Sequence, residues 1–256
     1  MDARHVYSAT LDYGMVDREE RLLLSGLFTL LQEAAIRHAN QYDTGNRLLT
    51  DRGESWVLNR IAVGIQNYPT YEDTVRVETW SRGITGFRGY REYRVYRGDT
   101  LLASASSLWI YVNLRTKTPL RVPEAVITRF PQIPGEAFEP GLDRLPLTAP
   151  AGEGLRTSAV SLRYGDVDPN LHVNNVAYVD FIQSALAAAG HAPRPRELQL
   201  KFIREIPPEL AAVEVVSQPA PADDAGLAVS IQSGPTVFAT GRWVDEQGRA
   251  ARALRP

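Results

Sequence analysis

Three polar side chains stand at alternating positions in the second half of the chain, just ahead of an apolar helical pattern. They are Asp168, Asn170 and His172. In an extended segment alternate residues point to one side, so we expect these three side chains to share a side. The helix that follows places unpaired peptide N–H groups at its positive end, at residues 173–176. A carboxylate beside such donors can act as base or nucleophile at a carbonyl carbon, while the donors stabilise the oxyanion that forms.

Two helical patterns stand out, one in each half of the chain. Apolar residues recur at i, i+3 and i+4 spacing over residues 24–40 and 175–189, which predicts two amphipathic helices. His38 lies on the apolar face of the first helix, so we expect it in the core. His5 and His191 have no polar companions, so we expect them at the surface.

The two helices belong to an internal repeat. The pattern Leu-x-Tyr-Gly-x-Val-Asp occurs at residues 11–17 and again at 162–168, an offset of 151 residues. Further along, two isoleucine–proline–valine–valine sets match at an offset of 138 residues, and the difference indicates a longer loop after the first helix. Two matches in the same order indicate a duplicated unit.

Each copy is predicted to contain one strand, one long helix and about four antiparallel strands. Runs rich in valine, tyrosine and tryptophan follow each helix, separated by turn residues. They lie at 57–65, 73–81, 87–97 and 100–113 in the first copy, and at 197–206, 211–217, 226–233 and 236–245 in the second. The single apolar helix of each copy is the one candidate to cover its sheet, which predicts an α+β fold. Residues 119–156 hold seven of the 17 prolines and little periodicity, which is typical of a linker.

The composition excludes several classes of protein and site. The 256 residues include no cysteine, which removes disulfides, thiolate catalysis, cysteine-ligated zinc and iron–sulfur clusters. The four histidines are scattered, so we expect no metal and no organic cofactor. A net charge of −2 gives no overall field for nucleic acid, and no nucleic-acid partner is expected. No stretch approaches the ~18 apolar residues of a membrane span, and the start does not resemble a leader, which together predict a cytoplasmic protein.

The segment from Asp166 to Val176 carries a resemblance to a known family. Its residues are Asp-Val-Asp-Pro-Asn-Leu-His-Val-Asn-Asn-Val, and they resemble the acyl-acyl-carrier-protein (acyl-ACP) thioesterases, whose motif is Asp-x-Asp-x-Asn-x-His-Val-Asn-Asn. The family's following Arg-Glu pair is matched by Arg204 and Glu205. Further matches in the first half are Trp56-Val57, Tyr68-Pro69, Glu78-Thr79-Trp80, Trp109 and Asn113. Because no transit peptide precedes these matches, the chain resembles a bacterial member.

The resemblance implies two tandem hotdog domains, in each of which an antiparallel β-sheet wraps one long helix. It implies hydrolysis of fatty acyl-ACP to free fatty acid and holo-ACP, the step that ends fatty acid synthesis. We therefore expect an N-terminal hotdog domain over residues 1–130 that holds the acyl chain. A linker over 131–157 and a C-terminal hotdog domain over 158–256 with the catalytic residues are expected to follow.

The resemblance also assigns catalytic positions. In this chain they are Asp168, Asn170, His172 and Glu205. We expect Asp168 to act as base or nucleophile and Glu205 to position water, with the division of labour between these two carboxylates left open. Asn170 and His172 are expected to orient and polarise the reacting groups.

The first copy lacks this set. At the offsets of the repeat, Asn170, His172 and Glu205 are replaced by glutamate, arginine and asparagine, and Asp17 alone keeps its type. The first copy is therefore not expected to be a second active site. The resemblance instead implies that its helix, with strands 56–67 and 87–97, lines the pocket for the acyl chain.

The expected partner is acyl carrier protein bearing a fatty acyl-phosphopantetheine group. Because such a carrier is acidic, a basic surface should receive it. Two basic runs are candidates: Arg115, Lys117, Arg121 and Arg129, and Arg194 with Arg196. An acyl-CoA thioesterase, a hydratase and a non-catalytic acyl-binding protein of the same fold remain alternatives, and a homodimer is left open.

Overall fold

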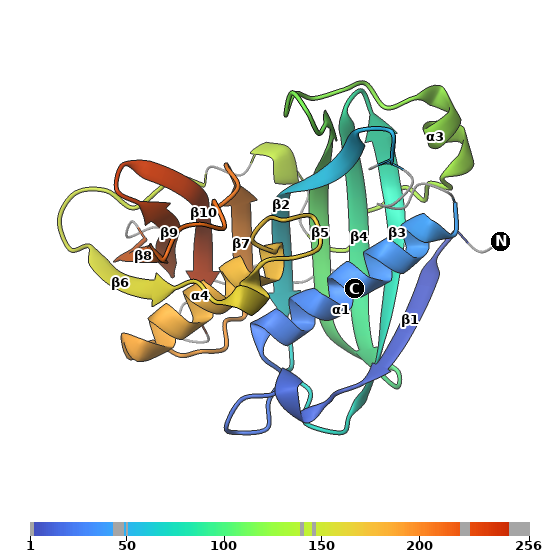
Figure 1. Cartoon of the computed structure of the whole chain (residues 1–256). Helices are drawn as coiled ribbons and strands as arrows, with labels where there is room; N and C mark the ends of the chain where they lie inside the picture. Colours follow the sequence, from blue (N-terminus) through green and yellow to red (C-terminus); the bar gives the residue numbers. More distant parts are fainter. Residues whose placement is uncertain are drawn as a thin grey trace. The chain divides into compact units, whose positions relative to one another are not determined.

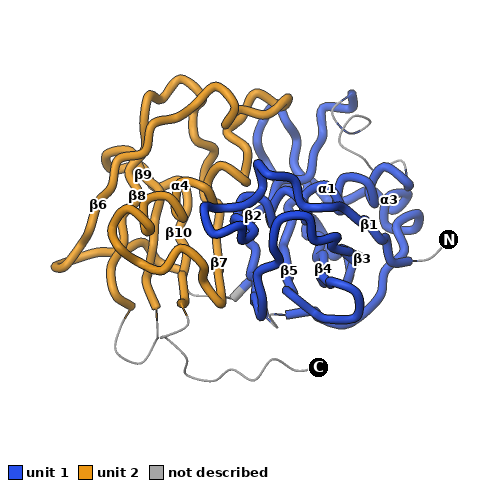
Figure 2. Tube along the Cα trace, turned by 90° about the horizontal axis from the view of Figure 1, so that it is seen from below, with its two compact units in different colours: residues 1–144 blue, residues 145–256 orange. Residues whose placement is uncertain are grey.

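The computed structural model divides into two compact units, residues 1–144 and 145–256 (Figure 2). It describes residues 3–42, 49, 51–138, 141–144, 147–220 and 226–245. The division between the units falls inside the segment predicted as a linker.

Unit 1 is one antiparallel sheet with a long helix packed along it (Figure 1). Its long elements are β1 (His5–Thr10), α1 (Leu24–Asn40), β2 (Glu54–Ile65), β3 (Thr74–Thr85), β4 (Arg88–Arg97) and β5 (Thr100–Asn113). The strand order is β1-β3-β4-β5-β2, with every neighbour antiparallel.

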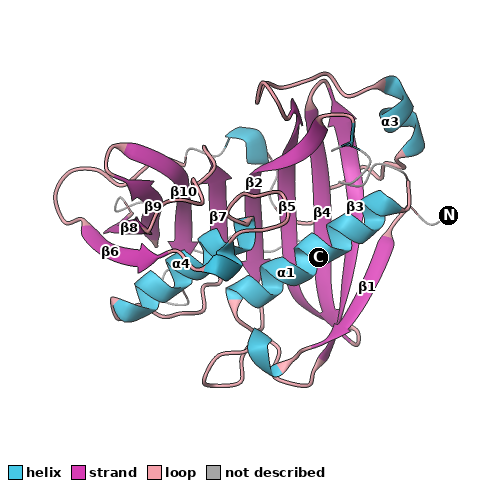
Figure 3. Cartoon of the chain, in the orientation of Figure 1, coloured by secondary structure: helices cyan, strands magenta, loops and turns pink. Residues whose placement is uncertain are grey.

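Unit 2 repeats this architecture with shorter strands (Figure 3). Its long elements are β6 (Arg156–Ser161), α4 (Asn175–Ala188), β7 (Glu197–Phe202), β8 (Ala212–Pro219), β9 (Leu227–Ser233) and β10 (Thr236–Val244). The strand order is β7-β10-β9-β8-β6, again antiparallel throughout. The predicted α+β class, with one long helix on each antiparallel sheet, is therefore confirmed.

The two units follow the offsets seen in the sequence. The helices begin at Leu24 and Asn175, which are 151 residues apart, and β3 and β8 begin at Thr74 and Ala212, which are 138 residues apart. A short 3-10 turn precedes each helix, at Tyr13–Met15 and Tyr164–Asp166. The repeat in the sequence is thus a repeat of the fold.

Each long helix is fixed by its apolar face. On α1, Leu27, Leu30 and Ala34 are at most 2% exposed, and they face a sheet whose Val75 and Val77 are fully buried. Burying one such leucine stabilises the fold by roughly 1.5–3 kcal/mol. The apolar residues that recur every 3.6 positions therefore mark the side of the helix that packs on the sheet.

The burial of three histidines agrees with the prediction only in part. His38 is fully buried on α1, as predicted. Burial, with the charge of Arg91 nearby, lowers the pKa of His38 to about 3. His5 is not simply at the surface, because its ring stacks on that of His38 at 5.7 Å and its Nε2 is buried. The Nε2 of His191 is also buried, and both residues are half-buried, so the expected surface position is met only in part.

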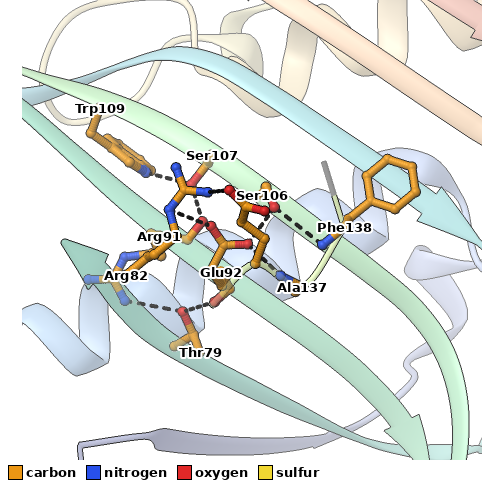
Figure 4. Close-up of polar contacts among 10 residues, drawn as sticks. Thr79, Arg82, Arg91, Glu92, Ser106, Ser107, Trp109, Ala137 and Phe138 are labelled. Atoms are coloured by element: carbon orange, nitrogen blue, oxygen red, sulfur yellow. Dashed lines mark hydrogen bonds and ion pairs between the residues drawn. The ribbon is translucent and has the colours of Figure 1, made fainter. Parts of the chain in front are cut away.

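Part of the predicted linker packs on the sheet of unit 1. The helix α3 (Glu124–Arg129) leads into a segment that we call the strap, residues 131–138. Ile133 donates to the carbonyl of Ser81 at 2.8 Å, and the ring of Phe138 occupies the space left by the missing side chain of Gly64. Figure 4 shows the carboxylate of Glu92 turned toward Ser106 and the amide of Ala137 in the strap.

No helix within the described ranges is long and apolar enough to cross a membrane.

Candidate active site

The segment that carries the candidate residues is a tight turn. Val167 and Val173 form an antiparallel bridge, and the N–H of Asp168 donates to the carbonyl of His172 at 2.9 Å. Leu171 takes a left-handed conformation with φ +62°. The prediction of an extended segment here is therefore wrong. Its physical cause is the Asp168 carboxylate, which accepts the N–H of Asn170 at 2.8 Å and closes an Asx turn.

The turn and a neighbouring segment bring the four predicted residues into two pairs. Within the turn, Asn170 Nδ2 lies 3.5 Å from Asp168 Oδ2. Across to the segment after β7, His172 Nε2 lies 3.3 Å from Glu205 Oε2. The side chains of His172 and Glu205 are 35% and 42% exposed, so the pair is open to a substrate.

A buried tyrosine of α4 holds the segment that carries Glu205. The hydroxyl of Tyr178 donates to the carbonyl of Arg204 at 3.2 Å and accepts the N–H of Ile206 at 2.9 Å. Burial raises the pKa of Tyr178, so the hydroxyl keeps its proton and can donate. Tyr178 was not predictable as a site residue, because its position in the helical pattern indicates only that it is buried.

The start of α4 has fewer open donors than expected. Asn174 is the N-cap, and its side chain accepts the N–H of Val176 at 2.9 Å. The N–H of Asn174 donates to the carbonyl of Asp166 at 2.8 Å. Two of the four N–H groups expected to be unpaired are therefore occupied. The N–H of Asn175 has no hydrogen-bond partner in the described part of the chain.

Asp166, the first aspartate of the motif, has a structural role. It is 4% exposed and accepts the N–H of Arg163 at 2.7 Å. The guanidinium of Arg163 bridges Asp166 at 2.8 Å and Asp180 of α4 at 2.6 Å. Hydrogen bonds to these two carboxylates raise the pKa of Arg163. The network ties the 3-10 turn to the helix.

The first copy builds the same turn without the candidate set. Glu20 is left-handed with φ +58°, and Asp17 Oδ1 accepts the N–H groups of Glu19 at 2.8 Å and Arg21 at 3.0 Å. Where unit 2 has the His172–Glu205 pair, the Arg21 side chain donates to the carbonyl of Tyr68 at 3.1 Å. The turn is therefore common to both copies, and the paired histidine and glutamate belong to one.

Within the described ranges, no group of three or more histidine, aspartate or glutamate side chains could hold a metal ion.

Two family models match the chain. The acyl-ACP thioesterase N-terminal domain matches residues 4–130, and the acyl-ACP thioesterase C-terminal domain matches residues 153–234.

Curated relatives include two chloroplastic plant enzymes. Dodecanoyl-[acyl-carrier-protein] hydrolase of Cinnamomum camphora is 32% identical over 167 residues, which are 59% of this chain and 43% of that protein. Palmitoyl-acyl carrier protein thioesterase of Cuphea hookeriana is 30% identical over 165 residues, 59% of this chain and 39% of that protein. The matched part thus spans about two fifths of the length of these relatives.

Solved structures share the whole fold. A putative oleoyl thioesterase from Lactobacillus plantarum superposes with a TM-score of 0.82 at 19% identity and covers 94% of both chains. The 12:0-ACP thioesterase from Umbellularia californica gives a TM-score of 0.80 at 20% identity, over 95% of this chain and 97% of that one. With both halves matched by the family's own domain models and the fold shared throughout, the chain belongs to the acyl-ACP thioesterase family.

Proposed function

We propose that the chain hydrolyses the thioester that joins a fatty acyl group to acyl carrier protein. Water adds to the acyl carbon, the carbon–sulfur bond breaks, and the carrier leaves as a free thiol beside a fatty acid. The observation that carries the proposal is the pair of contacts made by one turn of unit 2. Asp168 and Asn170 meet within the turn, and His172 of the same turn meets Glu205 of the segment after β7. The same turn of unit 1 keeps only the aspartate.

Each side chain has a role in this reaction. Asp168 is the base or nucleophile, and Asn170 orients it through the contact at 3.5 Å. Glu205 holds His172 toward the thioester carbonyl and positions the attacking water. A positioned base contributes roughly 10²–10⁴-fold to such a step.

The oxyanion that forms needs a donor that is not already used. The N–H of Asn175 meets this need, because it lies at the positive end of α4 and has no partner in the described residues. Loss of one such donor typically costs about 2.7–4 kcal/mol of transition-state stabilisation.

Unit 1 is proposed to hold the acyl chain. A small pocket of about 10 Å³ lies against the start of its helix, and its walls are almost entirely apolar. They include Leu27 of α1, Ile65 of β2 and Val95 of β4, which lie in the helix and strands expected to line the pocket. Apolar walls suit a hydrocarbon chain, and the side chains around this pocket have to move apart to admit one.

The acidic carrier protein is proposed to dock on the first basic run. Arg115, Lys117, Arg121 and Arg129 are all exposed, whereas Arg194 and Arg196 are half-buried. Exposed charges can steer an acidic partner and give a rate of association that falls with added salt. A cytoplasmic location stays a prediction of the sequence.

The decisive experiment measures thiol release from acyl-ACP and acyl-CoA side by side, across acyl chain lengths. We expect release from acyl-ACP at a higher kcat/KM than from the matching acyl-CoA. A preference for acyl-CoA would identify the alternative thioesterase, and release from neither would contradict the proposed function.

A further inference from the structure

Two apolar side chains are exposed beside the candidate catalytic residues. Leu171 is 74% exposed although it stands between Asn170 and His172 in the turn. Ile203 is 43% exposed, two residues before Glu205. The contact at 3.3 Å between His172 and Glu205 joins the segments that carry them.

Leu171 is also an unusual residue for its backbone conformation. Its φ of +62° lies in the left-handed region, which favours glycine or asparagine over a branched apolar residue. Neither the backbone nor burial therefore accounts for a leucine here. Such unfavourable residues are commonly found where a site has a use for them.

The repeat supplies an internal comparison. At the matching position of unit 1, Glu20 has nearly the same φ of +58° but a charged, exposed side chain. The N–H groups of Ile203 and Arg204 both donate to the carbonyl of Phe238, as those of Gln66 and Asn67 both donate to the carbonyl of Leu102. The counterpart of Ile203 is therefore Gln66, which is polar and half-buried. The left-handed turn thus belongs to both copies, whereas the exposed apolar pair occurs in the copy that carries the four candidate residues.

We propose that Leu171 and Ile203 form an apolar rim that binds the pantetheine arm of the substrate. The inference rests on the proposed function. Neighbouring Cα atoms are about 3.8 Å apart, so Leu171 directly adjoins His172, the residue proposed to polarise the thioester. The arm reaches the thioester from solvent, where the rim is exposed, whereas the acyl chain is assigned to unit 1. The methylene and dimethyl groups of the arm suit an apolar contact.

The test replaces the rim residue by two polar ones. Leu171→Asn suits the left-handed backbone, and Leu171→Glu introduces the residue type of unit 1. We expect KM to rise about tenfold with kcat within about twofold, because the contact is made in substrate and transition state alike. The same rise should be seen with acyl-ACP, acyl-CoA and acyl-pantetheine, which share the arm. Ile203→Ser should raise KM in the same way.

The matched control is Glu20→Leu, which places a leucine on the equivalent turn of unit 1 and should leave KM and kcat unchanged. Unchanged KM in the thermally stable Leu171 variants overturns the inference, and so does a rise confined to acyl-ACP, which would place the carrier protein on the rim. A fall in kcat at constant KM also overturns it. If the wild-type chain releases thiol from none of the three substrates, the proposed function fails and this inference with it.

Discussion

At the scale of single residues, the same aspartate forms the same turn twice. Asp17 Oδ1 accepts two peptide N–H groups, and Asp168 Oδ1 accepts the N–H of Asn170. Helping to form a turn therefore does not distinguish the two copies. Asp168 differs from Asp17 in its neighbouring side chains. The Asn170 amide lies near its second oxygen, and the same turn carries the His172 that pairs with Glu205.

Asp168→Asn should separate turn formation from catalysis. The asparagine keeps an oxygen that can accept the N–H of Asn170, so the turn and the melting temperature should change little. Its loss of charge removes the base or nucleophile, and turnover should fall by roughly 10²–10⁴-fold. Thiol release and thermal unfolding measure the two effects.

Asp17→Asn is the matched control, since Asp17 occupies the same turn. Turnover should stay within a few-fold of the wild type, with at most about 1 kcal/mol lost in stability. Equal losses of turnover in the two variants, or unfolding of Asp168→Asn, would show that the aspartate serves the turn alone.

At the scale of secondary structure elements, the long helices and most strands were predictable because their apolar residues repeat with a clear period. Helix α1 lies at Leu24–Asn40, as predicted, and α4 ends one residue before the expected position. The turn at residues 168–172 was not predictable from alternation, because a side chain to backbone hydrogen bond reverses the chain there. The helix α3 was missed because its six residues give too little periodicity.

Tyr178→Phe tests the link between α4 and Glu205. The variant removes the hydroxyl that binds the carbonyl of Arg204 and the N–H of Ile206. The buried N–H of Ile206 then lacks a partner, which should cost about 1–3 kcal/mol of stability. Glu205 should lose its fixed place, so kcat should fall about tenfold, the equivalent of about 1.4 kcal/mol. Chemical denaturation and steady-state kinetics measure both, and an unchanged kcat in a destabilised variant would contradict the positioning role.

Glu92, the buried carboxyl that the strap contacts, should make stability depend on pH. Burial raises the pKa of Glu92 to about 7 from 4.5, against the opposing hydrogen bonds from Ser106 and Ala137 and the charge of Arg82. The folded chain therefore keeps this proton in a pH range where the unfolded chain has lost it. By linkage, the contribution of Glu92 to stability is present below pH 4.5 and is lost as the pH rises through 7.

Glu92→Gln should remove this dependence. Between pH 4.5 and a pH above 7, the wild type should lose about 3 kcal/mol more of its free energy of unfolding than the variant does. Glu136→Gln is the comparison: Glu136 is 39% exposed, and its charge adds to the raised pKa of Glu92, so its loss should weaken the pH dependence without removing it. A difference that stays constant with pH for Glu92→Gln would exclude a buried, proton-holding carboxyl.

At the scale of the whole molecule, one fold is used twice and the two copies have diverged in complementary ways. Unit 2 carries the paired histidine and glutamate, and unit 1 has longer strands, the strap and the small apolar pocket against α1. The sequence could identify the copy with the motif, because types and spacing of polar residues are visible in it. It could not give the accepted acyl chain length, because that depends on the fit of many apolar side chains.

The proposed division of labour is tested by one change made in both copies. Ala34 of α1 and Ala185 of α4 stand 151 residues apart at matching positions, and they are 0% and 5% exposed. Replacing either by valine adds the same two methyl groups to the same side of the same kind of helix. Both variants should lose about 1–3 kcal/mol of stability through overpacking. Only Ala34→Val should shift the released fatty acids toward shorter chains, because only unit 1 is assigned the hydrocarbon tail. Analysis of the fatty acids released from mixed acyl-ACP substrates measures the shift, and the same shift in Ala185→Val, or none in a folded Ala34→Val, would refute that assignment.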